Sequence, residues 1–253
     1  MADLDRRYAQ GTTVGRTDAG VVDQGLRAYM IRVYNYMASG VAITGVVAYA
    51  IYAMSVVQGA GGLELTAFGQ FMFQSAFKWV VIFAPLALVF FISARINSMS
   101  LGTAQITFWI FAALMGASIS SIFLVYAGES IARVFFITAA SFGALSLWGY
   151  TTQRDLTGMG SFLLMGLFGI ILASIVNIFM ASSMLQFVIS VVGVLVFAGL
   201  TAWDTQRLKT EYLYGAMDGE TAERSSILGA LSLYLNFINL FTLLLQLLGQ
   251  REE

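Results

Sequence analysis

The sequence predicts an all-α integral membrane protein, built as a bundle of seven transmembrane helices. Of its 253 residues, 58% are hydrophobic and 11% are charged, and its mean hydropathy is +0.80. A soluble domain carries about 25% charged residues, so this chain has too little charge for a solvated surface. Charge-free apolar stretches recur along the chain, as expected for helices that cross a bilayer with about 20 residues each. None of them alternates as the strands of a membrane β-barrel do.

The N-terminal half is expected to supply a tail and three spans. Residues 1–30 are polar and contain four glycines, which predicts a mobile cytosolic tail before a transmembrane domain over residues 31–253. The second span contains Pro85, the only proline, and we expect a kink or an irregular segment there because proline removes a helical hydrogen bond. The three spans are expected at 33–57, 77–95 and 104–126.

The C-terminal half is expected to supply four more spans. The stretch from Leu156 to Trp203 has 48 residues and no charge, which is enough for two crossings. The weakly polar segment 181–184 marks the turn between them. The four spans are expected at 132–151, 160–180, 185–205 and 229–249.

Lysines and arginines predict the orientation, because they are enriched in cytoplasmic loops. If the N-terminus is cytosolic, three of these residues lie outside, namely Lys78, Arg133 and Arg251. The other ten lie inside, namely Arg6, Arg7, Arg16, Arg27, Arg32, Arg95, Arg154, Arg207, Lys209 and Arg224. This bias predicts a cytosolic N-terminus and, with seven spans, a C-terminus on the outer side.

Missing residue types exclude several function classes. The chain has no cysteine and no histidine, which excludes thiol catalysis, most zinc sites and hydrolases that need a histidine base. A retinal protein needs a lysine in its last helix, and residues 229–249 contain none. An intramembrane aspartyl protease needs two facing acids, and only Asp204 is well placed. The net charge of −1 provides no basic field for nucleic acid.

Asp204 is the strongest candidate for a functional side chain. It is expected at the cytosolic end of the sixth span, near the negative end of the helix dipole, where an acid is disfavoured. Small and polar residues of the sixth span fall within an arc of about 80° on a helix, and those of the seventh span do the same. Such stripes face a bundle interior or a wet crevice, although they also serve helix packing. They consist of Gln186, Ser190, Gly193, Thr201 and Asp204, and of Ser232, Asn236, Asn239 and Gln246.

Four segments carry a resemblance to a known family. They read GASISSIF at 116–123, GYTTQRDL at 149–156, GLTAWDTQ at 199–206 and LSLYLNFINLF at 231–241. With these segments the chain resembles the Bax inhibitor-1 family, also called the transmembrane Bax inhibitor motif family, and is especially similar to its YccA-like bacterial branch. The resemblance implies a bacterial inner-membrane protein with a central last helix, no enzymatic activity and no cofactor.

The resemblance also implies a pH-sensitive calcium leak. In that model two aspartates on the last two helices share protons near the cytosolic side, and an arginine of the second helix pairs with one of them. Asp204 matches the first aspartate, and Arg95 is the candidate arginine. Asn236 stands where the family has its second aspartate. This amide cannot ionise, but it can donate a hydrogen bond to Asp204, so we expect Asp204 to bind calcium only weakly.

Two other functions stay open. Because the bacterial branch is linked to a membrane-bound quality-control protease, the chain could be a non-conducting regulator that binds such a protease or another membrane protein. The tail over residues 1–30 would then be the contact surface. A small-solute transporter is the third reading, and it is disfavoured because the sequence contains no internal repeat and no pair of broken helices.

Overall fold

Seven helices cross the length of a bundle, as the sequence predicts. The computed structural model describes residues 2–59, 62–215 and 219–251, with side chains described from Gln24 onward except that of Asn97. Within these residues seven helices are long and apolar enough to span a membrane. They are Gln24–Ser55 of α1 (Ala2–Ser55), α3 (Phe77–Arg95), α4 (Leu101–Ile119) with the 3-10 turn η2 (Ser120–Leu124), α5 (Gly128–Thr151), α6 (Thr157–Met180), α7 (Ser183–Tyr214) and α8 (Gly219–Leu248).

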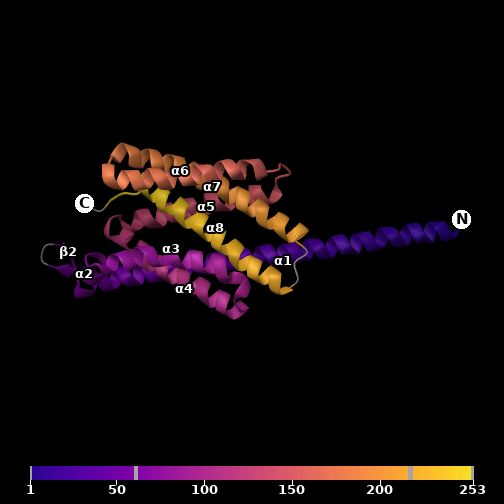
Figure 1. Cartoon of the computed structure of the whole chain (residues 1–253), viewed down its shortest axis with the longest axis horizontal. Helices are drawn as coiled ribbons and strands as arrows, with labels where there is room; N and C mark the ends of the chain where they lie inside the picture. The colour runs from indigo at the N-terminus through magenta and orange to yellow at the C-terminus, as the bar shows by residue number, and fades with distance from the viewer. Residues whose placement is uncertain (1, 60–61, 216–218, 252–253) are drawn as a thin grey trace.

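The last helix, α8, lies at the centre of the bundle. In the most apolar 18-residue stretch of α8, 67% is buried inside the bundle, against 39% or less in the corresponding stretch of every other span. It packs against α7, α1, α5 and α4, and Figure 1 shows it running diagonally across the middle of the molecule. Tyr234 is fully buried at its core, where its ring contacts Phe108 and Phe111. The central last helix is therefore confirmed.

The two ends of the chain lie at opposite ends of the bundle (Figure 1). We call the end where α7 stops and α8 begins the N-terminal face. The opposite end carries an antiparallel hairpin of β1 (Val56–Gly59) and β2 (Gly62–Leu65), followed by α2 (Ala67–Phe73). The sequence did not predict this hairpin.

The helices extend further at the N-terminal face than the charge-free stretches predict. α7 continues to Tyr214 instead of ending near 205, and α8 begins at Gly219 instead of near 229. Asp204 therefore lies inside a continuous helix and not at its end, which corrects the predicted position. The reason is packing: the extra turns contact α1, where the Tyr29 and Tyr212 rings stack at 5.0 Å and Arg32 pairs with Glu223 at 2.9 Å.

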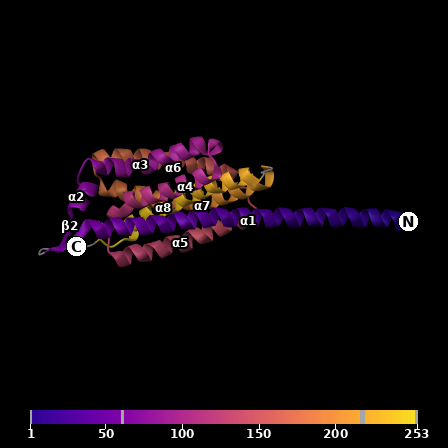
Figure 2. The same ribbon diagram turned by 90° about the horizontal axis from the view of Figure 1, so that it is seen from below.

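The bundle also begins earlier along α1 than residue 31. Leu26, Tyr29 and Met30 are buried in the main hydrophobic core, although they belong to the segment that we expect to be a polar tail. Figure 2 shows α1 lying along the bundle and continuing beyond it toward the N-terminus. Most of the expected mobile tail consists of residues 1–23, whose side chains lie outside the described part of the chain.

The described helix α3 is not interrupted at Pro85, where the sequence predicts a kink or an irregular segment. α3 runs unbroken across Pro85 from Phe77 to Arg95, where the 3-10 turn η1 (Ile96–Ser98) follows. The turn between α6 and α7 lies where the sequence predicts it. Ala181 takes a left-handed conformation with φ 49°, and the Ser182 hydroxyl accepts a hydrogen bond from the Leu185 amide at 3.3 Å, which caps α7.

Candidate functional site

Asp204 is a buried acid with a partner on each carboxylate oxygen. Its side chain is 8% exposed. Oδ1 lies 2.9 Å from Nη2 of Arg207, one turn further along α7, and Oδ2 accepts a hydrogen bond of 2.7 Å from Nδ2 of Asn236 on α8. A buried charge is tolerated when it is paired and hydrogen-bonded. The amide contact that the sequence suggested between Asn236 and Asp204 is therefore present.

The arginine that pairs with Asp204 is Arg207 and not Arg95. Arg95 lies exposed in the last turn of α3, and no ion pair of its side chain is found among the described side chains. Arg207 pairs with Asp204 because its position three residues further along the same helix places the two side chains next to each other. That spacing is visible in the sequence and could have identified this pair.

The polar stripes of α7 and α8 face a common cavity of about 830 Å³, which we call the long cavity. From the two stripes it takes Gln186, Asp204, Ser232, Asn236, Asn239 and Gln246. Its other walls are mainly apolar, and they come from Ile82, Pro85, Leu86 and Val89 on α3, Met115 and Ser118 on α4, and residues of α6 between Leu164 and Ile178. The expectation that the stripes line a crevice holds for these six residues.

Thr201 and Gly193 of the α7 stripe serve packing. The Thr201 hydroxyl donates to the carbonyl oxygen of Phe197 at 2.8 Å and is fully buried. Gly193 packs directly against the Leu243 side chain, because a Cβ there would lie 2.7 Å from a methyl group of Leu243. The alternative that the sequence left open, helix packing, is correct for this part of the α7 stripe.

An amide network lies at the end of the long cavity that is away from Asp204. Oε1 of Gln246 accepts hydrogen bonds from Nε2 of Gln186 at 2.8 Å and from the Ser190 hydroxyl at 2.9 Å. Asn177 of α6 donates to Gln186 in turn, at 3.1 Å. The cavity thus has a charged end at Asp204 and a neutral polar end at Gln246.

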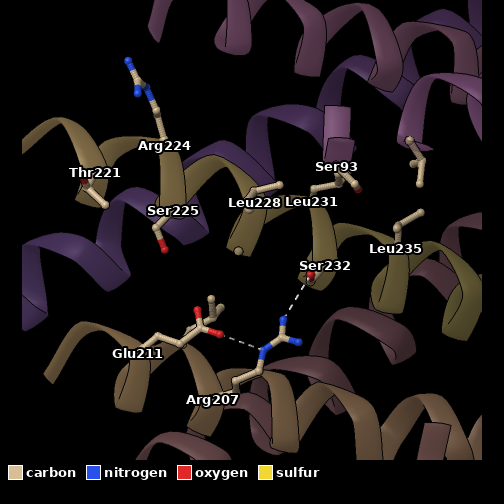
Figure 3. Close-up of a pocket in the computed structure, with 13 residues that line it drawn as sticks. Ser93, Arg207, Glu211, Thr221, Arg224, Ser225, Leu228, Leu231, Ser232 and Leu235 are labelled. Carbon is tan, nitrogen blue, oxygen red and sulfur yellow. Dashed lines mark hydrogen bonds and ion pairs between the residues drawn. The ribbon is translucent and has the colours of Figure 1, made fainter. Parts of the chain in front are cut away.

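A second cavity of about 360 Å³, which we call the vestibule, lies at the N-terminal face. It is lined by Val89 and Ser93 of α3, Arg207, Leu208 and Glu211 of α7, and Thr221, Arg224, Ser225, Leu228, Gly229, Leu231, Ser232 and Leu235 of α8. Figure 3 shows the Glu211 carboxylate and the Arg207 guanidinium directed toward each other at one side of it. Glu211 was not among the residues predicted from the sequence, because a charged residue past the apolar stretch is usually a solvated one.

The loop that precedes α6 is held against α7 by the motif residue Gln206. Its Oε1 accepts a hydrogen bond from the Leu156 amide, and its Nε2 donates to the Arg154 carbonyl oxygen, both at 2.8 Å. Hydrogen bonds from Thr157, of its side chain first and then its backbone amide, lower the pKa of the exposed Asp155 carboxyl below its ordinary value. These contacts give a structural role to Gln206 of the motif segment at 199–206 and to the end of the motif segment at 149–156, because they hold the two segments together.

Asp204 offers little to a resident metal ion. Both of its oxygens contact other side chains, and no group of three or more acidic residues suited to a metal is found among the described residues. Around it lie the amide of Asn236 and the hydroxyl of Ser232.

Fold and site together define a multi-pass membrane bundle with a central helix and a mainly apolar cavity, along which polar residues lead to a buried acid. The chain belongs to the Bax inhibitor family, because the family model described as "Inhibitor of apoptosis-promoting Bax1" matches residues 26–253. It is 45% identical to the inner membrane protein YbhL of Escherichia coli K12, over 90% of this chain and 94% of YbhL. It is also 47% identical to protein RP147 of Rickettsia prowazekii, over 91% and 93% of the two chains, and 45% identical to a protein of Caulobacter vibrioides over the full length of both.

Proposed function

We propose that this protein is a cation leak of a bacterial inner membrane, with calcium as the permeant ion, no chemical step and no cofactor. The observation that supports it best is the long cavity, whose polar floor leads along α8 to the Asp204 carboxylate. Liquid water takes about 30 Å³ per molecule, so a cavity of about 830 Å³ has room for a cation with several waters.

The ligand set favours conduction over storage. Calcium prefers oxygen ligands, and a pore must bind its ion weakly enough to release it. A single carboxylate beside amides and hydroxyls meets that condition. With an amide at position 236, any influence of pH at this pair has to act through Asp204 alone.

We place the N-terminal face in the cytosol. The charge bias supports this orientation, and the inner-membrane name of the relative from Escherichia coli supports the membrane. In this orientation Asp204 and the vestibule face the cytosol, while the amide network around Gln246 lies toward the outer side.

Calcium uptake into liposomes that contain the purified full-length protein tests the proposal. We expect flux above that of protein-free liposomes, and a clear loss in Asp204→Asn, which keeps the shape of the side chain but removes its charge. A protein that passes no ion in either form would contradict the leak and favour the non-conducting regulator of other membrane proteins.

Cysteine labelling tests the wetness of the path independently, because the chain has no cysteine of its own. Thr242 lines the long cavity, so Thr242→Cys places a thiol there. Leu195→Cys on α7 is the control, because Leu195 lies on the apolar outer surface of the bundle and is 67% exposed. A charged thiol reagent should label position 242 and leave position 195 unmodified in liposomes. Equal labelling of the two would contradict a water-filled cavity.

A further inference from the structure

Arg207 lies at the junction of the two cavities. It lines both the vestibule and the long cavity, as do Val89, Ser232 and Leu235. Of these four residues Arg207 alone is charged. A cation that moves from the vestibule into the long cavity therefore passes its guanidinium.

Two carboxylates lie within reach of this guanidinium, on opposite sides of the junction. Nη2 contacts Asp204 at 2.9 Å, toward the long cavity, and Nε lies 3.5 Å from Oε1 of Glu211, toward the vestibule. Asp204 and Glu211 are the only acids among the residues that line the two cavities. All three residues share one face of α7, with spacings of three and four positions.

The contact with Glu211 is the looser of the two. Nε of Arg207 is buried, and it makes no hydrogen bond within the described structure. The Glu211 side chain is 45% exposed, against 8% for Asp204. The vestibule leaves room beside Glu211 (Figure 3), so rotation of the long Arg207 side chain alone could bring the guanidinium fully onto Glu211.

Other side chains hold the guanidinium in its present place. Its central carbon lies 5.0 Å from the centre of the Trp203 ring, and Nη2 donates to the Ser232 hydroxyl at 3.4 Å. Arg224, the other arginine of the vestibule, pairs with Glu220 at 3.2 Å, and Figure 3 shows it directed away from Arg207. The junction therefore contains one guanidinium at a defined position.

The charges set the consequence for a passing cation. With Arg207 on Asp204 the pair is neutral, and an entering cation meets a like charge at the junction. With Arg207 on Glu211 the guanidinium is still paired, while the Asp204 carboxylate becomes free for the cation. The guanidinium stays paired throughout the exchange, and the entering cation takes its place beside the buried Asp204 carboxylate, so neither charge is left buried without a partner.

We propose that Arg207 is a tethered counter-cation that closes the path at Asp204, and that Glu211 receives its guanidinium when a cation takes its place. This inference rests on the cation path proposed above and adds the element that controls it. It assigns roles to two residues, Arg207 and Glu211, that the resemblance to the family did not indicate.

The test is calcium flux in proteoliposomes of the full-length protein and its variants. Arg207→Gln should raise the flux by about tenfold or more, because a unit charge in contact with the path strongly opposes a cation. Arg207→Lys, which keeps the positive charge but replaces the planar guanidinium group, should raise the flux less. Lys209→Gln is the matched control, since it removes one positive charge from the same helix but from a side chain that donates to the Tyr150 carbonyl oxygen, and it should leave the flux unchanged.

Glu211→Gln tests the second half of the proposal and does not depend on the folding of Arg207→Gln. It should lower the flux about threefold, the scale of a partly exposed ion pair, and it should have no effect when Arg207→Gln is already present. An unchanged flux in Glu211→Gln would overturn the role of Glu211.

The outcomes separate the two proposals. Suppose that the natural protein conducts and that Asp204→Asn lowers the flux. If Arg207→Gln then leaves the flux unchanged, or if Arg207→Lys raises it as much as Arg207→Gln does, Arg207 is not the closing element and the leak still stands. If the natural protein, Asp204→Asn and Arg207→Gln all pass no calcium, while gel filtration shows folded protein, the leak itself is wrong.

Discussion

Asn236 of α8 donates its amide hydrogen to Oδ2 of Asp204 on α7 across 2.7 Å, and 32 positions of the chain separate the two residues. The amide occupies the place where a second carboxylate would share a proton with Asp204. Since the other carboxylate oxygen contacts Arg207, the charged form of Asp204 has a favourable partner on both sides. This geometry determines what substitutions at the two positions should do.

Removing the acid should destabilise the bundle. Asp204→Ala takes away the partners of Arg207 and Asn236, which are otherwise left in a largely buried place. We expect a loss of about 2 kcal/mol in the free energy of unfolding, the scale of hydrogen bonds to charged groups, measured by thermal unfolding in detergent. Asp155→Ala on the exposed loop is the control, and it should cost much less because it leaves no buried group without a partner. Equal losses in the two variants would mean that Asp204 is no more than a solvated acid.

Asn236→Asp should make the flux depend on pH. Two carboxylates in contact share protons and titrate as a pair, whereas the natural pair has one ionisable group. We expect a calcium flux that changes little between about pH 6 and 8 for the natural protein, because its single carboxylate is paired with Arg207 and hydrogen-bonded to Asn236, and both contacts favour the charged form. In the variant, flux and calcium binding should rise with pH across that window as the second carboxylate ionises.

Asn239→Asp controls for this change, since position 239 lines the same cavity but its amide donates to the Leu235 carbonyl oxygen. It should leave the profile flat. A steep profile in the natural protein that Asn236→Asp does not alter would place the pH sensor elsewhere.

Gly149→Ala should be strongly destabilising. A Cβ at Gly149 would collide with the backbone of Ala202 at its carbonyl oxygen, so α5 and α7 would have to move apart. We expect a loss of about 3 kcal/mol, at the upper end for overpacking. Gly143→Ala on the same helix meets nothing within 4 Å and should be neutral or stabilising, because alanine favours helix. Thermal unfolding of the two variants side by side decides the point, and equal melting temperatures would contradict the close packing.

Asp155 should contribute to stability only above acidic pH. Hydrogen bonds from Thr157 lower the pKa of its carboxyl in the folded protein. A group with a lowered folded pKa stabilises the protein above its unfolded pKa, about 3.9 for aspartate, and the contribution is lost as pH falls through the folded value. Melting temperatures measured below about pH 4 should therefore fall less steeply in Asp155→Asn than in the natural protein. Parallel curves would show that this carboxylate does not stabilise the loop.

Reporter fusions should place the two ends of the chain on opposite sides of the membrane. Seven spanning helices require this, and the distribution of lysine and arginine predicts a cytosolic Met1 and an outer Glu253. A reporter that is active only in the cytosol should work at Met1 and fail at Glu253. Activity at both ends would contradict the seven-span topology.

Much of the architecture was predictable from the sequence, because crossing a bilayer makes simple demands. A span needs a minimum apolar length with its backbone bonded internally, so charge-free stretches predict the number and order of the helices. The turn at Ala181 and the contact between Asp204 and Asn236 also agree with the sequence-based expectations. Four short segments were enough to indicate the family.

By itself, then, the sequence determined a seven-helix membrane protein of this family with a polar stripe on each of its last two helices. Only the tertiary structure decided how far α7 and α8 extend, that Asp204 is buried, and that Arg95 does not pair with it, whereas the spacing of Asp204 and Arg207 was already visible in the sequence. The physical reason is that hydropathy reports where a chain can meet lipid, while burial and charge pairing depend on which helix faces another. At the N-terminal face α1 covers the polar ends of α7 and α8, and no single segment of the sequence carries that information.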